Sequence, residues 1–272
     1  MDWEKIYILV QEVVENVREE YILNNTIIKD DIFRILEKHC VVFYYPIEDE
    51  TKNRGFHIKR FLNGKLTDFV YINTANTMAE QIFAAAHELG HVWKVASKVW
   101  EKLGTEHYEK LTEEIEERIV GRFAAELLMP EKEFKMTFRA HIEGLGFDPT
   151  HIRFEQIIRV MVMQMCDYMV PYEAVRRRMI ETSIISQEIG EIFCADKYSK
   201  IDDIVSAYLK DLNTALEERS KKKTIPGLRD LLVKAEESGA VSEYVLSKIK
   251  EDFSVEGVKT TDQIINISVE GE

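Results

Sequence analysis

The spacing of apolar residues changes twice along the first hundred residues, from helical to extended and back to helical. Near the N-terminus, apolar side chains recur every three or four positions and predict an amphipathic helix; they are Ile6, Val10, Val13, Val14 and Val17. A second, shorter helix is predicted over residues 29–39, where the run DDIFRILEKH has the same spacing.

Three segments rich in β-branched and aromatic residues follow and predict a small sheet. They are 40–45 (CVVFYY), 55–61 (GFHIKRF) and 66–73 (LTDFVYIN). Between the last two lies Asn63-Gly64, a pair typical of a tight hairpin turn. We therefore expect three strands in a mainly antiparallel sheet with an exposed edge.

Helical spacing returns after residue 73 and continues for most of the chain. Thr77 and Glu80 have the spacing of a capping box and begin a helix predicted over about 77–96. Further helices are predicted over 112–128, 131–140, 152–168 and 170–181, and a helical pair turns at Gly239. The pattern predicts an α+β fold, with one domain over 1–185 and a helical C-terminal extension of unknown role over 186–272.

Charge and composition exclude several classes of protein. Lys and Arg number 36 and Asp and Glu 49, so the net charge is −13, which argues against direct nucleic-acid binding. The arginines at 176–178 are interpreted as a solvated face or helix-end charge. The densest apolar stretch, 157–166, is about half the length of a membrane span. With acidic residues at the start and no CxxC pair among three cysteines, we expect a soluble, cytoplasmic protein without a signal peptide.

The stretch His87-Glu88-Leu89-Gly90-His91 carries candidate chemistry. Two histidines four residues apart share one face of a helix, so both imidazoles can reach a single ion. Glu88 points about 100° around the helix from His87, which suits it to deprotonating a bound water rather than to binding the metal. This arrangement is typical of a metal-assisted hydrolase.

A catalytic zinc site needs a third protein ligand, and the next predicted helix offers four acidic residues. They are Glu113, Glu114, Glu116 and Glu117. Glu117 shares its face with Val120, Gly121 and Ala124, which are small or apolar and allow close approach to the HExxH helix. Glu117 is therefore the preferred ligand. Glu113 is the second choice, because it lies in the first turn, where a carboxylate is also explained by its favourable interaction with the helix dipole.

These motifs together resemble the ImmA/IrrE family of zincin-like metallo-endopeptidases. The resemblance covers about residues 25–180 and depends on HExxH, on Glu117 twenty-six residues after His91, and on the run FAAELLMP at 123–130. It implies one Zn²⁺ bound by His87, His91 and Glu117, with Glu88 as the catalytic base. It also implies a protein substrate, a helix-turn-helix repressor whose cleavage controls mobile-element or stress-response genes.

The chain departs from the family pattern at one position of that helix. Where the family usually has Ala-Asn, this sequence has Val120-Gly121. The side-chain amide of the family's asparagine is expected to hydrogen-bond to a metal ligand on the side away from the metal. Hydrogen-bond partners of this kind are worth about 10–100-fold in affinity or activity. Glycine cannot do so, and a water molecule or another side chain has to replace it.

Several points stay open in the sequence. The donor that stabilises the oxyanion could be Tyr108, His107 or His141, whereas Tyr71 is assigned to the sheet. Mn²⁺ or Fe²⁺ could occupy the same ligands as Zn²⁺. A second hypothesis for the function is a metal-containing binding, anti-repressor or toxin–antitoxin module without proteolytic turnover. The oligomeric state is not predicted.

Overall fold

The chain divides into two compact units, Met1–Lys223 and Thr224–Glu272, in a computed structural model. The structure describes residues 1–21, 27–48, 52–62, 64–104, 110–195 and 200–254. The strands are β1 (Val41–Tyr45), β2 (Gly55–Leu62) and β3 (Lys65–Asn73). Helices of the first unit are α1 (Trp3–Tyr21), α2 (Asp31–His39), α3 (Met78–Val92), α4 (Val95–Leu103), α5 (Glu113–Leu128), α6 (Glu131–Gly144), α7 (Phe154–Tyr168), α8 (Tyr172–Glu181), α9 (Gln187–Ile192) and α10 (Lys200–Leu212). The predicted α+β class is confirmed.

The three predicted strands form one sheet in the order β1-β3-β2. β2 and β3 make the expected antiparallel hairpin, with His57 opposite Val70. The expectation of a mainly antiparallel sheet is wrong for β1, because β1 runs parallel to β3 with Val41 opposite Phe69. The hairpin returns the chain so that β3 runs in the direction of β1, and β3 is central. β1 and β2 are consequently the two edges of a mixed sheet.

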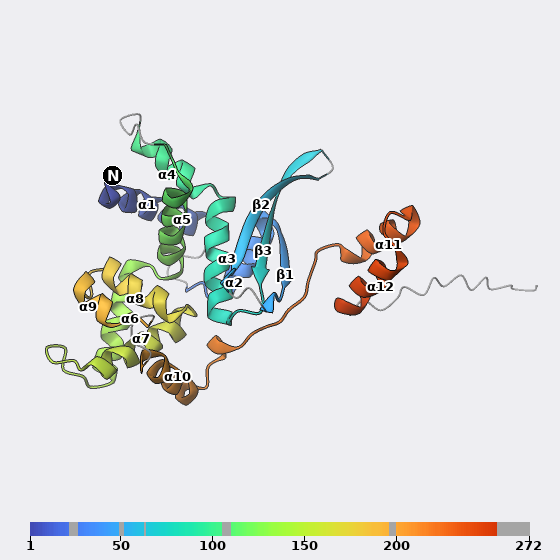
Figure 1. Ribbon diagram of the computed structural model, residues 1–272. Coiled ribbons are helices and arrows are strands. Elements are labelled where there is room, and N and C mark those ends of the chain that lie inside the picture. The colour runs from blue at the N-terminus through green and yellow to red at the C-terminus, as the bar shows by residue number, and fades with distance from the viewer. Residues whose placement is uncertain (22–26, 49–51, 63, 105–109, 196–199, 255–272) are drawn as a thin grey trace, which may run out of the picture. The chain divides into compact units, whose positions relative to one another are not determined.

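Helix α3 lies between this sheet and α5 (Figure 1). Its N-terminus is the predicted capping box, in which the Glu80 amide donates to Thr77 Oγ1 at 3.3 Å and the Thr77 amide donates to Glu80 Oε2 at 3.1 Å. The helix ends at Val92 and not near 96, because Lys94 adopts a left-handed conformation with φ of 53° and α4 begins at Val95. The core side of α3 is made of small residues, so that Ala85 and Ala86 are fully buried.

The end of β3 is fixed by the buried side chain of Asn73. Its Oδ1 accepts hydrogen bonds from the amides of Ile47 and Ala75 at 3.0 and 3.1 Å. Its Nδ2 donates to the carbonyls of Ile47 and Asn53 at 3.1 and 2.9 Å. This single side chain therefore ties the loops after β1 and before β2 to the segment that enters α3.

Charged side chains join α8 to α5 inside the protein, and the predicted solvated face at 176–178 is wrong for two of its three arginines. Arg176 and Arg178 are buried, whereas Arg177 is exposed. Arg178 Nη2 lies 2.6 Å from Glu126 Oε2, and its Nε donates to the Met129 carbonyl at 2.8 Å. A periodicity of charge cannot reveal these contacts, because the acceptors are supplied by a helix about fifty residues earlier.

The first unit continues beyond residue 185, where the sequence places the end of the peptidase domain. Helix α10 packs on α7, and the following segment contacts the start of α3. There the Met78 amide donates to the Glu218 carbonyl at 2.8 Å, and Thr74 Oγ1 donates to the Lys222 carbonyl at 2.8 Å. Residues 187–223 thus belong to the same compact unit, while the functional limit of the domain stays a prediction.

The second unit is described by itself as a helical pair, α11 (Leu228–Ser238) and α12 (Glu243–Asp252). The chain turns at Gly239 with φ of 62°, which confirms the predicted turn between the two helices. Leu232 and Leu246 are buried in this unit. In the described part of the chain, no helix combines the length and apolarity needed to cross a membrane.

Candidate metal centre

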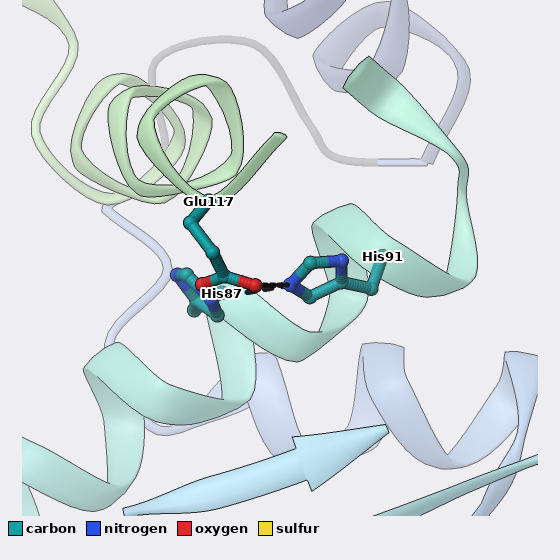
Figure 2. A group of neighbouring side chains, drawn as sticks. All are labelled: His87, His91 and Glu117. Atoms are coloured by element: carbon teal, nitrogen blue, oxygen red, sulfur yellow. Dashed lines mark hydrogen bonds and ion pairs between the residues drawn. The ribbon is translucent and has the colours of Figure 1, made fainter. Parts of the chain in front are cut away.

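Three side chains converge in the first unit with the geometry of a metal site. Nε2 of His87 lies 3.3 Å from Nε2 of His91. Glu117 reaches both rings, with Oε2 at 3.1 Å from His87 Nε2 and Oε1 at 3.2 Å from His91 Nε2 (Figure 2). One ligand atom from each residue lies within 4.8 Å of the other two. The three residues that the sequence predicts as ligands are therefore brought together around one point.

Two packed helices hold these side chains in place. His87 and His91 are one turn apart on α3, while Glu117 lies in the second turn of α5, whose N-cap Thr112 accepts a hydrogen bond from the Ile115 amide at 3.3 Å. The helices approach closely at Gly90, where an added Cβ would lie 2.8 Å from Val120 Cγ1. Because Gly90 has no side chain, α5 can lie close to α3, and the Glu117 carboxylate comes within reach of the two imidazoles.

The other acidic residues of α5 fall into different environments. Glu113, the second choice from the sequence, is exposed, as is Glu114. Glu116 instead reaches the far side of His91, where its Oε1 lies 3.3 Å from Nδ1. The position expected to support a ligand from behind, Gly121, has no atom within 4 Å of an added Cβ. The carboxylate that contacts His91 on this side is therefore that of Glu116, five residues before Gly121.

Glu88 is buried beside the cluster, with only 6% of the residue exposed. It faces the sheet, because a Cβ added at Gly55 of β2 would lie 3.5 Å from its Cγ and Oε1. Burial raises the pKa of Glu88 to about 7, with a smaller upward contribution from Glu117 and an opposing one from His87. A carboxyl group with a pKa near neutrality can both accept and return a proton.

The charges of the cluster also influence its members. A hydrogen bond with His87 is the main reason that the pKa of Glu117 is lowered, so this carboxylate stays ionised. Burial and the neighbouring His87 lower the pKa of His91, which favours the neutral imidazole. Metal ions bind neutral imidazole and ionised carboxylate, so both shifts favour the ligand form.

The set of donors fits a divalent transition metal. Two imidazole nitrogens and one carboxylate oxygen are the protein ligands of many catalytic zinc sites and leave one position for water or substrate. With an ion bound, Glu116 on the other side of His91 would complete the carboxylate–imidazole–metal arrangement that orients such ligands. His87, His91 and Glu117 could therefore hold one ion, while their role as ligands and that of Glu88 as base stay predictions.

The candidates for oxyanion stabilisation are distributed differently. His107 and Tyr108 lie outside the described residues. Nε2 of His141 lies 2.6 Å from Asp167 Oδ2, in a contact between α6 and α7. Tyr71 is a sheet residue, as expected, and its hydroxyl donates to the Tyr45 carbonyl at 2.8 Å.

Sequence reasoning missed His57, a residue of β2 near the cluster. Its ring centroid lies 6.2 Å from that of His91, and the two ring planes differ by 14°. Its place in a predicted strand was clear from the sequence. The packing of β2 on α3 brings His57 close to the cluster, and this packing depends on contacts between residues far apart in the sequence.

A large cavity lies elsewhere in the first unit. Its volume is about 740 Å³, and its lining comes from α6, α7, α9 and the loops beside them. Apolar residues such as Phe138, Ile157 and Ile192 dominate this lining, and no member of the metal cluster contributes to it.

Comparison with known proteins gives one family. Residues 37–145 match the peptidase family described as the IrrE N-terminal-like domain. The match begins in α2 and ends just beyond α6, so it includes the sheet, α3 and α5. No curated protein and no solved structure matches the chain.

Proposed function

We infer from the membership of residues 37–145 in the IrrE N-terminal-like peptidase family that this chain is a metal-dependent endopeptidase. The observation that carries this proposal is the convergence of His87, His91 and Glu117, with buried Glu88 beside them. A metal-dependent peptidase needs a site for the ion and a base beside it, and these four side chains are the candidates for both roles.

Zn²⁺ is the proposed cofactor, as one ion per chain. The mixture of imidazole nitrogen and carboxylate oxygen is typical of catalytic zinc sites, although Mn²⁺ and Fe²⁺ accept the same donors. When bound, the ion supplies Lewis acidity toward the scissile carbonyl and the attacking water.

Glu88 carries the proton through the reaction. Its carboxylate takes a proton from the attacking water as the oxygen adds to the scissile carbonyl carbon. The same carboxyl group then gives that proton to the departing amine nitrogen as the C–N bond breaks. Burial raises the pKa of Glu88 in the metal-free protein, which makes this carboxyl group a stronger base, and a bound cation would favour its ionised form.

The proposed substrate is a helix-turn-helix repressor, whose cleavage in the cytoplasm would release the genes that it controls. The resemblance of HExxH, Glu117 and FAAELLMP to the ImmA/IrrE family supports this class of substrate. The net charge of −13 is compatible with it, because proteins that bind DNA present basic surfaces that an acidic partner attracts.

The test compares the wild type with Glu88→Gln and His87→Ala. Zinc content is measured for all three, and each is incubated with any helix-turn-helix repressor that is encoded beside its gene. We expect the wild type to bind one zinc and cleave, Glu88→Gln to bind zinc without cleaving, and His87→Ala to lose both properties.

The same variants address the alternative of a binding module when expression from the repressed promoter is also measured with a reporter. If Glu88→Gln relieves repression as well as the wild type does, turnover is not needed and the peptidase proposal is wrong. A wild-type protein that binds no divalent metal would contradict the metal centre itself.

A further inference from the structure

His57 lies on the sheet side of the metal cluster. Side chains alternate along β2, so that Gly55, His57 and Lys59 share one face. This face is directed toward α3, because Gly55 lies against Glu88 and the His57 ring lies parallel to that of His91 at 6.2 Å. β2 is also an edge strand, with β3 on one side only.

One nitrogen of His57 is already engaged. Nε2 lies 2.6 Å from Asp68 Oδ1, and Lys59 Nζ lies 3.5 Å from the same oxygen. An ionised carboxylate can only accept, so the His57 Nε2–H donates to Asp68. This bond fixes the ring orientation, and in the neutral imidazole it places the lone pair on Nδ1, where another partner can donate to it.

His57 is separate from the three predicted ligands. The cluster that could hold an ion within the described residues consists of His87, His91 and Glu117. The side chain of His57 is 14% exposed, so it is held by the protein and still accessible. A rigid hydrogen-bond acceptor beside the cluster, on an edge strand, suits a peptide backbone better than it suits a metal.

We propose that His57 is a substrate-binding residue, whose Nδ1 accepts a hydrogen bond from a backbone N–H of the bound peptide close to the scissile bond. The inference depends on the proposed peptidase function, and it adds a contact on the sheet side of the metal cluster. Asp68 is its positioning partner, because it orients the ring without reaching the peptide.

Two inhibitors that differ only in their peptide part test this contact. Both acetohydroxamate and a tripeptide hydroxamate can bind the zinc-loaded protein through the hydroxamate, but only the second presents a peptide backbone. Affinities are measured by calorimetry for the wild type and for His57→Leu, which keeps a similar volume and removes the acceptor. We expect His57→Leu to bind the tripeptide hydroxamate about tenfold more weakly and acetohydroxamate unchanged, as expected for one lost hydrogen bond.

Two further variants serve as controls: His57→Asn tests whether another acceptor can replace Nδ1, and Arg60→Ala tests a neighbouring residue of β2. The side-chain oxygen of asparagine can lie where Nδ1 lies, so His57→Asn should retain most of the affinity that His57→Leu loses. Arg60 is exposed on the opposite face of β2, and Arg60→Ala should leave the binding of both compounds unchanged. Zinc content is measured for every variant.

The outcomes separate this inference from the function on which it depends. If the wild type binds neither hydroxamate, the proposed metal centre is wrong, and the proposed function with it. Should both compounds bind the wild type and His57→Leu equally, the metal centre stands and the role of His57 is refuted. Loss of zinc in His57→Leu, or equal weakening of both compounds, would also refute it, because His57 would then support the metal ligands instead.

Discussion

Glu116 lies behind His91, with its Oε1 3.3 Å from the Nδ1 that faces away from Glu117. A carboxylate in this position accepts the Nδ1–H of a metal-bound imidazole, fixes its tautomer and makes it a stronger ligand. The family resemblance leads one to expect such support from an amide at position 121, where this chain has glycine. Glu116 is placed to provide it from the preceding turn of the same helix.

Replacing Glu116 should therefore weaken metal binding without removing a ligand. We expect Glu116→Ala to lower the affinity for Zn²⁺ by about 10–100-fold, the range found for supporting partners of metal-bound histidines. Competition with a chromophoric chelator measures this affinity. Glu114→Ala is the matched control, because Glu114 is exposed two residues away on the same helix. An unchanged affinity in Glu116→Ala would mean that His91 does not depend on this contact.

Two glycines near the cluster should respond in opposite directions to alanine. At Gly90 the new methyl group would lie 2.8 Å from Val120 Cγ1 and 3.0 Å from Phe123 Cδ1, so these side chains must shift or α3 and α5 must move apart. We expect Gly90→Ala to lower the free energy of unfolding by about 1–3 kcal/mol and to weaken zinc binding, because Glu117 moves with α5. Gly121→Ala meets no atom within 4 Å and should raise the free energy of unfolding by roughly 0.5–1 kcal/mol.

A second substitution identifies the cause of the Gly90→Ala effect. Adding Val120→Ala removes the Cγ1 atom that the new methyl group meets, so the double variant should regain part of the zinc affinity. Urea unfolding and chelator competition are measured for both variants. If the double variant is no better than Gly90→Ala at binding zinc, the close approach at Val120 is not what positions Glu117.

Arg178 and Arg177 are neighbours in sequence and should differ sharply in their contribution to stability. Arg178 is fully buried and contacts Glu126 and Glu181, whereas the side chain of Arg177 is 69% exposed. Arg178→Ala leaves the buried Glu126 with Arg122 at 3.7 Å in place of Arg178 at 2.6 Å, and should lower the free energy of unfolding by up to about 3–5 kcal/mol. Arg177→Ala should change it by no more than about 0.5 kcal/mol. Equal effects in urea unfolding would show that the buried network contributes little.

These residues also show which features of the protein could be predicted from its sequence. The capping box of Thr77 and Glu80, the shared face of His87 and His91, and the end of α5 before Pro130 all depend on residues within one or two helical turns. Glu117 could be chosen because the small residues on its face indicate close packing of two helices. Local spacing was enough for each of these predictions.

Other features depend on residues far apart in the chain and could not be predicted in this way. The parallel pairing of β1 with β3 and the burial of Arg178 against Glu126 follow from tertiary packing. The same is true of the approach of His57 to His91, since strand periodicity places His57 on a face but not against a particular helix. The contact between Glu116 and His91 was missed because the close packing at Gly90 lets two adjacent acids reach α3 from different sides.

The buried carboxyl group of Glu88 should make the stability of the metal-free protein depend on pH. Its pKa is raised from 4.5 to about 7, mainly by burial, so between these values the folded state binds more protons than the unfolded state. Stability due to this group is therefore lost as the pH rises from about 4.5 to 7, and above that range the loss is complete at about 3–4 kcal/mol. Glu88→Gln carries no charge at any pH and avoids the loss.

In urea unfolding with EDTA, we expect Glu88→Gln to exceed the wild type in stability by that amount at pH 8 and to approach it near pH 4.5. A difference between the two proteins that stays constant over this range would show that Glu88 ionises in the folded state as readily as it does in water.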